Sequence, residues 1–378
     1  MRGHVRKRGN KYAIVVDLGR DYNGKRKQKW FSGYDTKKQA EKDLPKIIMQ
    51  VENTGYVETE DITFGEYIKL WLEKKKDNIA YGTYHHYESY CRNHIIPGLG
   101  KWKTKKLKES HVKSFLMSLR DEDKSLSKRT QLHIFRVLRN AINAGTKYGV
   151  PQNLFEDIEA PKVPRQNIEY WTQTEVKKYL SYLKGEMHFL PIFLAITTGM
   201  RQGEVLGLRW EDIDFENKTI SVRQQLKKKE KKDANGRYEL SQVLKTSSSY
   251  RVISLDSRTI EELKKHKKKQ DDDKEKAESA YKNYNLVNAT ITGNFILPSN
   301  LNDVYWRVIK KSGIKRISFH ALRHTHATIM LKQGVHPKVV QERLGHSSIQ
   351  ITLDTYSHAI PGLQKAAAEK FGEFLDDD

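Results

Sequence analysis

Six side chains in the second half of the sequence could together bind a phosphate ester and attack it. In chain order they are Arg201, Lys245, His320, Arg323, His346 and Tyr356. Guanidinium groups are planar and permanently charged, and they hold phosphate oxygens through paired hydrogen bonds. A tyrosine hydroxyl can act as a nucleophile, but its reference pKa near 10 makes ionisation at pH 7 cost about 4 kcal/mol. A base or hydrogen-bond acceptor near the tyrosine is therefore needed.

The spacing of these residues places several of them together. Glu204 follows Arg201 by three residues, about one helical turn, so the two side chains can lie side by side. His320 and Arg323 share one helix face for the same reason. Lys245 lies in a predicted hairpin, just before a predicted strand. Taken singly, each residue is ordinary, because a helical arginine usually forms a surface ion pair and one tyrosine among 19 usually packs in a core.

The complete ordered set is more specific, because it resembles the signature of the tyrosine recombinase (phage integrase) family. That signature is Arg, Lys, His-x-x-Arg, His or Trp, and Tyr, and this sequence departs from it at no position. The resemblance is strong through the blocks 198–210, 245–255, 319–333 and 344–356. The upstream part is more weakly similar to integrases of phages and conjugative transposons. The resemblance implies a site-specific recombinase that cleaves and rejoins DNA through a 3′-phosphotyrosyl intermediate, and so integrates and excises a mobile element.

The resemblance also implies a role for each residue. Arg201 and Arg323 would stabilise the charge that develops on the non-bridging phosphate oxygens. Tyr356 would be the nucleophile, and His320 would help to deprotonate it.

The remaining signature residues would complete the reaction. Lys245 would protonate the leaving 5′ oxygen, and His346 would donate a hydrogen bond to the phosphate. Glu204 would orient Arg201 or His320. Because one phosphoester replaces another, no ATP, metal ion or other cofactor is expected.

The partner implied by the family is double-stranded DNA, bound at core-type and arm-type sites. Strand exchange between two duplexes implies a homotetramer, with one protomer for each cleaved strand. Accessory excision proteins or host DNA-bending proteins would be further partners. The implied location is the cytoplasm of a bacterial host cell, with no membrane association.

The composition agrees with a polyanionic partner. Lys and Arg number 69 against 47 Asp and Glu, a net charge of +22, and phosphates that bind such residues release condensed counterions. Hydrophobic residues make up 37% of the chain, which is enough for folded cores. The single Cys91 cannot form an internal disulfide, as is usual in a reducing compartment. The longest apolar stretch, 189–196, contains a proline and is too short to span a bilayer.

The sequence predicts a multidomain, mainly α-helical protein with small β elements (α+β). Four segments are expected: an arm-type DNA-binding domain of a small sheet plus a helix, an all-α core-binding domain, a mostly helical catalytic domain with a small antiparallel sheet, and a C-terminal tail for protomer contacts. Their ranges are 1–55, 62–160, 170–360 and 361–378. The capping boxes Thr63–Glu66 and Thr172–Glu175 mark the first helices of the second and third segments.

The arm-type segment is small and basic. Strands are predicted at 12–18 and 25–31, with a turn at 21–24 and a helix at about 35–50. Its strands could lie against a DNA groove, or form a solvated basic sheet with Trp30 in the core. The candidate DNA contacts here are Lys25, Arg26, Lys27 and Lys29. In the core-binding segment, Lys101, Lys103 and Lys105 could grip phosphates or only solvate a loop.

Two charged or amphipathic segments have less specific interpretations. Residues 361–375 are expected to form a short helix with one apolar stripe, which docks on a neighbouring protomer or packs on its own domain. The highly charged stretch 264–282 is expected to be a solvated helical insertion without a catalytic role.

Other functional classes fit part of these observations. A DNA-binding regulator without catalysis would share the charge and the domain order, and covalent trapping on DNA distinguishes it. A type IB topoisomerase shares the chemistry but does not account for two upstream DNA-binding segments. A metal-dependent hydrolase would use the histidines, but no thiolate lies near them and the carboxylates are not at ligand spacing. The histidines in question are His320, His324, His326 and His346.

Overall fold

The computed structural model divides the chain into two compact units, Met1–Arg165 and Gln166–Asp378. The residues that it describes are 3–9, 11–20, 26–54, 62–120, 126–164, 168–233, 236–242, 250–356, 368–369 and 371–372. In this described part, no helix is both long enough and apolar enough to cross a membrane.

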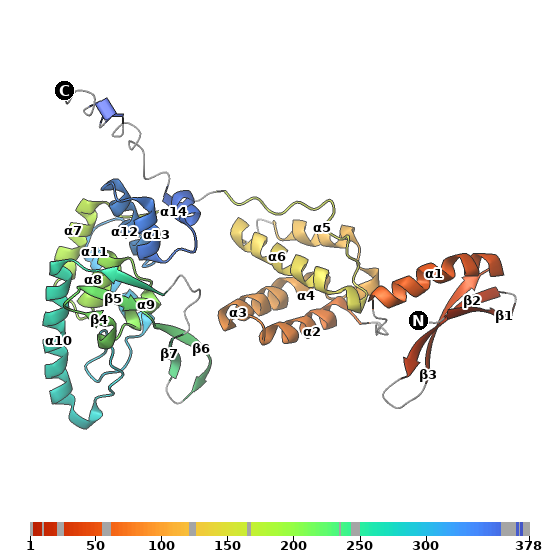
Figure 1. The fold of residues 1–378 in the computed structure, drawn as a ribbon, viewed down its shortest axis with the longest axis horizontal. Helices are drawn as coiled ribbons and strands as arrows, with labels where there is room; N and C mark the ends of the chain where they lie inside the picture. Colours follow the sequence, from red (N-terminus) through yellow and green to blue (C-terminus); the bar gives the residue numbers. More distant parts are fainter. Residues whose placement is uncertain are drawn as a thin grey trace. The chain divides into compact units, whose positions relative to one another are not determined.

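The first unit begins with β1 (Gly3–Arg8), β2 (Lys11–Arg20), β3 (Arg26–Tyr34) and α1 (Lys37–Thr54). The strands form an antiparallel sheet in the order β1-β2-β3, and α1 packs on one face of it (Figure 1). Ile14, Val16 and Ala40 are buried between sheet and helix. Both predicted strands and the predicted helix are present, and β1 is an additional strand. The predicted turn at 21–24 lies outside the described residues.

The rest of the first unit is a helical bundle. Its helices are α2 (Phe64–Lys76), α3 (Tyr81–Tyr90), α4 (Ile96–Leu99), α5 (Glu109–Ser118) and α6 (Lys128–Ala144). The predicted capping box forms at the start of α2, where the Glu66 N–H donates to Thr63 Oγ1 at 3.2 Å and the Thr63 N–H donates to Glu66 Oε2 at 2.7 Å. A π-helical turn, Cys91–Ile95, joins α3 to α4.

The second unit is mostly helical, with two small antiparallel sheets. Its helices are α7 (Gln173–Leu183), α8 (Phe189–Thr198), α9 (Gln202–Leu206), α10 (Ser257–Ala277), α11 (Pro298–Ser312), α12 (Ala321–Lys332), α13 (Pro337–Leu344) and α14 (Ile349–Tyr356). One sheet consists of β4 (Ile213–Asp214), β5 (Thr219–Val222) and β8 (Arg251–Ser254), and the other of β6 (Gln225–Asp233) and β7 (Gly236–Ser241). The predicted fold class is therefore confirmed.

Helix α10 contains most of the charged stretch 264–282. The helix begins seven residues earlier than that stretch and packs against α8, with Ile260 and Leu263 in the core of the unit. Within the stretch itself, the buried Gln270 accepts a hydrogen bond from Trp210 Nε1 at 2.6 Å. The start of the helix and Gln270 thus anchor α10 to the domain, while most side chains of the stretch 264–282 are exposed, as expected for a solvated helix.

Three helices of the second unit meet at Gly199. This residue ends α8 in the left-handed backbone conformation, at φ +68°. A Cβ atom there would lie 2.7 Å from Leu344 Cδ2, on α13, and 2.8 Å from His326 Cδ2, on α12. Glycine is needed both for the backbone conformation and for the close approach of the helices.

We expect Gly199→Ala to destabilise the second unit more than the matched substitution Gly313→Ala. Gly313 ends α11 at φ +62° but has no atom within 4 Å of its Cβ position, so alanine there adds only backbone strain of about 1–2 kcal/mol. Gly199→Ala adds the displacement of Leu344 and His326, about 1–3 kcal/mol more. Urea unfolding of the two variants measures the difference, and equal losses would contradict it.

Candidate active site

Arg323 is a buried cation on α12, with 3% of the residue exposed. Its Nη1 donates to the carbonyl oxygen of Gly199 at 3.0 Å, and its Nη2 donates to that of Leu344 at 2.5 Å. These oxygens lie at the C-terminal ends of α8 and α13, where carbonyls lack partners inside the helix and carry partial negative charge. Burial first, and then Arg201 and Arg251, lower the pKa of Arg323 to about 9, so the group is still charged at pH 7.

Glu204 is a buried carboxylate that two arginines share. Its Oε1 accepts from Arg201 Nη1 at 2.7 Å, and its Oε2 accepts from Arg251 Nη2 at 2.8 Å. Burial alone would raise the pKa of Glu204, but Arg251 and Arg201 outweigh burial and hold that pKa below its ordinary value. Two cations beside one anion leave the site positive, and the partly exposed Arg201 side chain can reach a ligand.

His346 lies in the connection from α13 to α14. Its backbone N–H donates to the carbonyl of Gln341 at 3.1 Å, and its Nδ1 is 2.8 Å from Thr352 Oγ1. Burial, followed by Arg323 and Arg201, lowers the pKa of His346 to about 3. The imidazole is therefore neutral at pH 7 and can donate through only one of its ring nitrogens.

Tyr356 is the last residue of α14, and its side chain is fully buried. The ring packs in a cluster of apolar residues from α12 and α13, namely Ala327, Leu331, Val340 and Leu344. Its hydroxyl oxygen is 2.8 Å from Nδ1 of His324. Burial raises the pKa of Tyr356 above its ordinary value, against a smaller lowering by the charge of Arg323.

The structure brings Arg201, Arg323, His346, Tyr356 and Glu204 together in one electrostatic group. The charges of Arg201 and Arg323 act on the pKa of His346, that of Arg201 acts on Glu204, and that of Arg323 acts on Tyr356.

His320 stands immediately before α12 and is exposed. The residue as a whole is exposed, but protein atoms crowd one side of its ring, and this partial desolvation first, then Arg323 and Arg201, lowers its pKa. The hydrogen bond to Tyr356 is made by His324, which the sequence interpretation had assigned no role in recombination. One signal could have indicated it, since His324 follows His320 by one helical turn. Lys245 lies outside the described residues.

The histidines near the site are engaged by protein groups. His326 Nδ1 donates to the carbonyl of Ile196 at 3.0 Å, and its Nε2 accepts from Arg343 Nε at 3.0 Å. Burial, and then Arg343, lower the pKa of His326 to about 3. Within the described residues, no group of three or more His, Cys, Asp or Glu side chains is placed to hold a metal ion.

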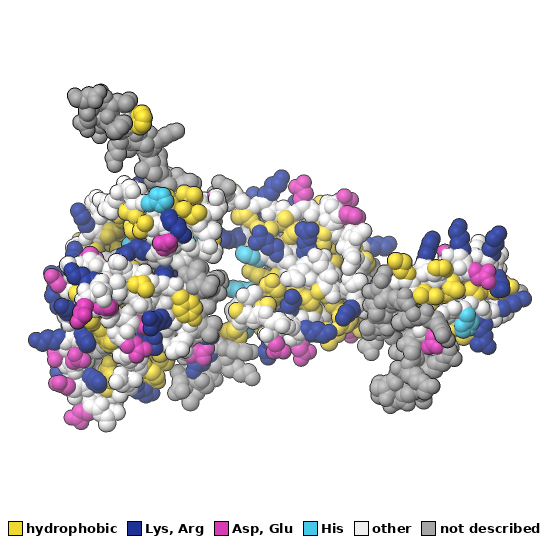
Figure 2. Space-filling model, viewed as in Figure 1, with side chains coloured by type: hydrophobic (Ala, Val, Ile, Leu, Met, Phe, Trp, Pro, Cys, Tyr) yellow, Lys and Arg dark blue, Asp and Glu magenta, His cyan; other side chains and the backbone are white. Residues whose placement is uncertain are grey.

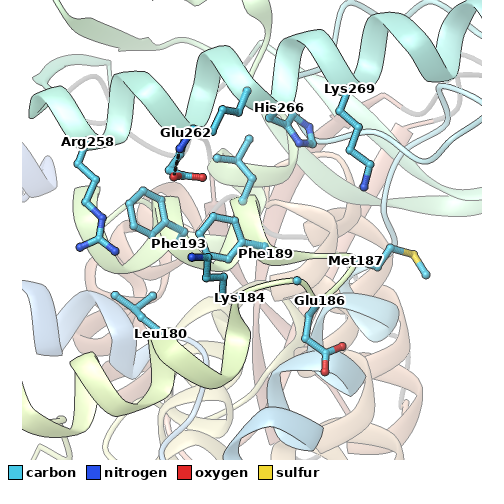
Figure 3. Close-up of a pocket in the computed structure, with 13 residues that line it drawn as sticks. Leu180, Lys184, Glu186, Met187, Phe189, Phe193, Arg258, Glu262, His266 and Lys269 are labelled. Carbon is cyan, nitrogen blue, oxygen red and sulfur yellow. Dashed lines mark hydrogen bonds and ion pairs between the residues drawn. The ribbon is translucent and has the colours of Figure 1, made fainter.

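A pocket of about 320 Å³ lies apart from this group, lined by α7, the connection to α8, α8 itself and α10 (Figure 3). Phe189 and Phe193 stack in it, with ring centroids 5.3 Å apart; Lys184 lies beside them, and Lys269 lies farther along α10, beyond His266. None of the residues predicted to be catalytic lines this pocket. Its walls combine apolar side chains with both basic and acidic ones, including Glu186 and Glu262.

The basic residues of the first unit also form a defined surface. Arg6 and Arg8 of β1 lie over the ring of Trp30, with guanidinium carbons 5.6 and 5.9 Å from its centroid. Neighbouring residues of a strand point to opposite faces of the sheet. Phe31 packs toward α1, so Trp30, the residue before it on β3, lies on the open face of the sheet and not in the core. The side chains of Lys25, Arg26, Lys27 and Lys29 lie outside the described set.

The helical bundle carries the other predicted contacts. Lys101 and Lys105 are exposed and Lys103 is partly buried, around the short turn Thr104–Lys106. Lys and Arg side chains are spread across the helices of the bundle on the face shown in Figure 2.

Three family models match the chain. The model described as the phage integrase family matches residues 170–361. A phage integrase N-terminal SAM-like domain matches 63–120, and an arm DNA-binding domain matches 4–51.

Similar proteins are found along almost the whole chain. A "Tyrosine recombinase XerC-like" protein of Caldanaerobacter subterraneus subsp. tengcongensis is 34% identical over 383 residues, which covers 96% of each chain. The ICEBs1 integrase of Bacillus subtilis is 24% identical and covers 90% of this chain and 91% of its own. Among solved structures, the Tn1549 transposon integrase with transposon right end DNA has a TM-score of 0.68 at 23% identity, over 82% of this chain and 100% of that one. A lambda integrase dimer bound to a core site has a TM-score of 0.57 at 17% identity, over 94% of each chain.

The low histidine pKa values predict that acid destabilises the second unit. His326 binds a proton near pH 6.5 when unfolded but near pH 3 when folded, so its stabilising contribution is complete above pH 6.5 and is lost as the pH falls toward 3. The free energy of unfolding should fall by up to about 1.4 kcal/mol per pH unit for this residue. His326→Gln, whose amide can keep both hydrogen bonds, should make the fall shallower in urea unfolding between pH 7 and pH 5. An unchanged slope would contradict a neutral buried His326.

Proposed function

The chain belongs to the phage integrase family of tyrosine recombinases, and we propose that Tyr356 is the nucleophile with which this site-specific recombinase cleaves and rejoins DNA strands. The observation that carries the proposal is the position of Tyr356. Its hydroxyl lies in the same electrostatic group as Arg201, Arg323 and His346, which are the side chains suited to hold a phosphate.

The cleavage step follows from the charges around the phosphate. Attack by the Tyr356 oxygen on phosphorus builds negative charge on the non-bridging oxygens, and Arg201 and Arg323 stabilise it. In Arg323, two of the five N–H bonds are directed at backbone carbonyls, which leaves the others for the phosphate. The positions of the arginines are fixed before DNA binds, because Glu204 and two helix ends hold them.

The leaving group and the reversal complete the cycle. Lys245 protonates the departing 5′ oxygen, and neutral His346 donates a hydrogen bond to the phosphate. The product is a 3′-phosphotyrosyl linkage with a free 5′-hydroxyl. A 5′-hydroxyl from a partner strand then attacks the same phosphorus and releases Tyr356, so that one phosphoester replaces another.

The upstream segments bind double-stranded DNA in this proposal. The open face of the β1-β2-β3 sheet, with Arg6, Arg8 and Trp30, binds arm-type sites. The helical bundle with Lys101, Lys103 and Lys105 binds the core-type site beside the catalytic domain. Segments 1–55, 62–160 and 170–360 thus act as separate DNA-contacting domains. Four protomers assemble on two duplexes, with the tail 361–378 in contact between them, to integrate and excise a mobile element.

Covalent trapping tests the nucleophile. Tyr356→Phe should abolish covalent protein–DNA adducts on a nicked target, because phenylalanine has no oxygen that can attack phosphorus. DNA affinity should be unchanged, and stability should fall by only about 1 kcal/mol for the lost hydrogen bond to His324. Gel analysis under denaturing conditions measures the adduct. Adducts that persist would assign the attack to another residue, such as the exposed Tyr250, and the absence of adducts even with the unchanged protein would favour a regulator without catalysis.

The open face of the sheet generates a second prediction. Replacing Arg6 and Arg8 together by alanine should weaken binding to arm-type DNA and reduce the slope of log affinity against log salt by about 2, because two phosphate contacts are lost. The matched control is Lys38→Ala with Lys42→Ala on α1, which removes the same charge from exposed positions of the helix. Binding assays at several salt concentrations compare the two. An equal loss in the control would show a general effect of charge, and core-site cleavage should persist in both.

A further inference from the structure

The hydroxyl of Tyr356 has a partner that the family signature does not supply. Nδ1 of His324 lies 2.8 Å from the hydroxyl oxygen, and the two ring centroids are 5.7 Å apart. His320, which carries the expected base role, directs its ring edge against His324 with centroids 5.2 Å apart. Among the described residues, His324 is the hydrogen-bonding partner of the Tyr356 hydroxyl.

The tyrosine donates this hydrogen bond. A buried phenol O–H needs an acceptor, and Nδ1 of His324 is the atom within reach. Burial, and then His320 and Arg323, lower the pKa of His324 to about 4, so its imidazole is neutral at pH 7 and one ring nitrogen can accept. Burial raises the pKa of Tyr356, so the proton stays on the phenol oxygen at pH 7.

We propose that His324, and not His320, accepts the phenol proton when Tyr356 attacks the scissile phosphate. This inference rests on the proposed function of Tyr356. As the bond from oxygen to phosphorus forms, the O–H bond breaks and its proton moves to Nδ1 of His324. The bond from phosphorus to the 5′ oxygen breaks, and the leaving oxygen takes a proton from the general acid. In rejoining, the incoming 5′-hydroxyl returns a proton to that acid, and His324 returns its proton to Tyr356.

The charges that face His324 couple this step to bound DNA. On its own helix it faces His320 and Arg323, and from the segment after α13 and from α14 it faces His346 and Tyr356. The positive charge of Arg323 opposes protonation of His324. A DNA phosphate held by Arg323 offsets that charge, while attack on phosphorus makes the phenol more acidic. His324 therefore becomes an effective base only when the phosphate is in place.

Single-turnover cleavage of a nicked target by the full-length protein tests the proposal. His324→Ala should slow cleavage by about 100-fold or more, the usual contribution of a general base, with unchanged DNA binding. Replacing Tyr356 by a fluorinated tyrosine, whose more acidic phenol needs less help from a base, should restore much of that loss. His324→Asn places an amide where Nδ1 stands and keeps the contact without basicity, so it should also be slow and also be rescued. His326→Gln, two residues along α12, should cleave normally.

Each result supports or overturns the assignment. Normal cleavage by His324→Ala overturns it. The His320→Ala variant is tested in parallel: if the fluorinated tyrosine restores cleavage by His320→Ala but not by His324→Ala, the assignment is also overturned. Normal cleavage by His324→Asn with ordinary tyrosine would show that His324 only positions the hydroxyl. If His324→Ala does not fold, the asparagine variant gives the same comparison. These outcomes differ from failure of the nucleophile assignment, in which Tyr356→Phe still forms adducts.

Discussion

The buried guanidinium of Arg323 is the interaction on which the arrangement of the second unit depends. A cation shut away from water is unfavourable unless its N–H groups find acceptors, and helix ends have carbonyls that need donors. The bonds to Gly199 and Leu344 satisfy both requirements and tie α8, α12 and α13 together. Because His346 and α14 follow α13 directly along the chain, the same bonds determine where His346 and Tyr356 lie.

The net charge of the site is positive, because its buried carboxylate lies among several buried or partly buried arginines. Glu204 is a buried carboxylate that Arg201 and Arg251 share, so the cations around it are not fully neutralised. Burial first, and then that excess of positive charge, lowers the pKa values of His324 and His346 and keeps both imidazoles neutral. A phosphate is the ligand that offsets this excess, and a site built before the ligand arrives loses little free energy to reorganisation. The repulsion between the arginines of the site therefore also favours the binding of an anion.

Much of the fold and of the site could be predicted from the sequence, because those parts depend on local patterns. Capping boxes at Thr63 and Thr172 depend on residues three apart, and both form. Strand β1 was missed because Gly3–Arg8 has no apolar alternation beyond Val5, and its support comes from pairing with β2 and packing against α1. Arg251 was missed because its role depends on contacts with Glu204 and Arg343, which are distant in sequence. His324 was missed because the signature directs attention to His320, one turn away.

In the proposed mechanism, the burial of Tyr356 keeps the nucleophile in an unreactive state. The phenol is fully buried, keeps its proton at pH 7 and donates to a neutral histidine, so there is almost no phenolate to attack water-accessible esters. The groups that would make it reactive, Arg323 and His324, are already adjacent to it. Only a bound phosphate changes the electrostatics of both groups together, because it offsets the charge of Arg323 and so allows His324 to accept a proton. In this proposal, recognition of DNA and activation of the nucleophile are the same electrostatic event.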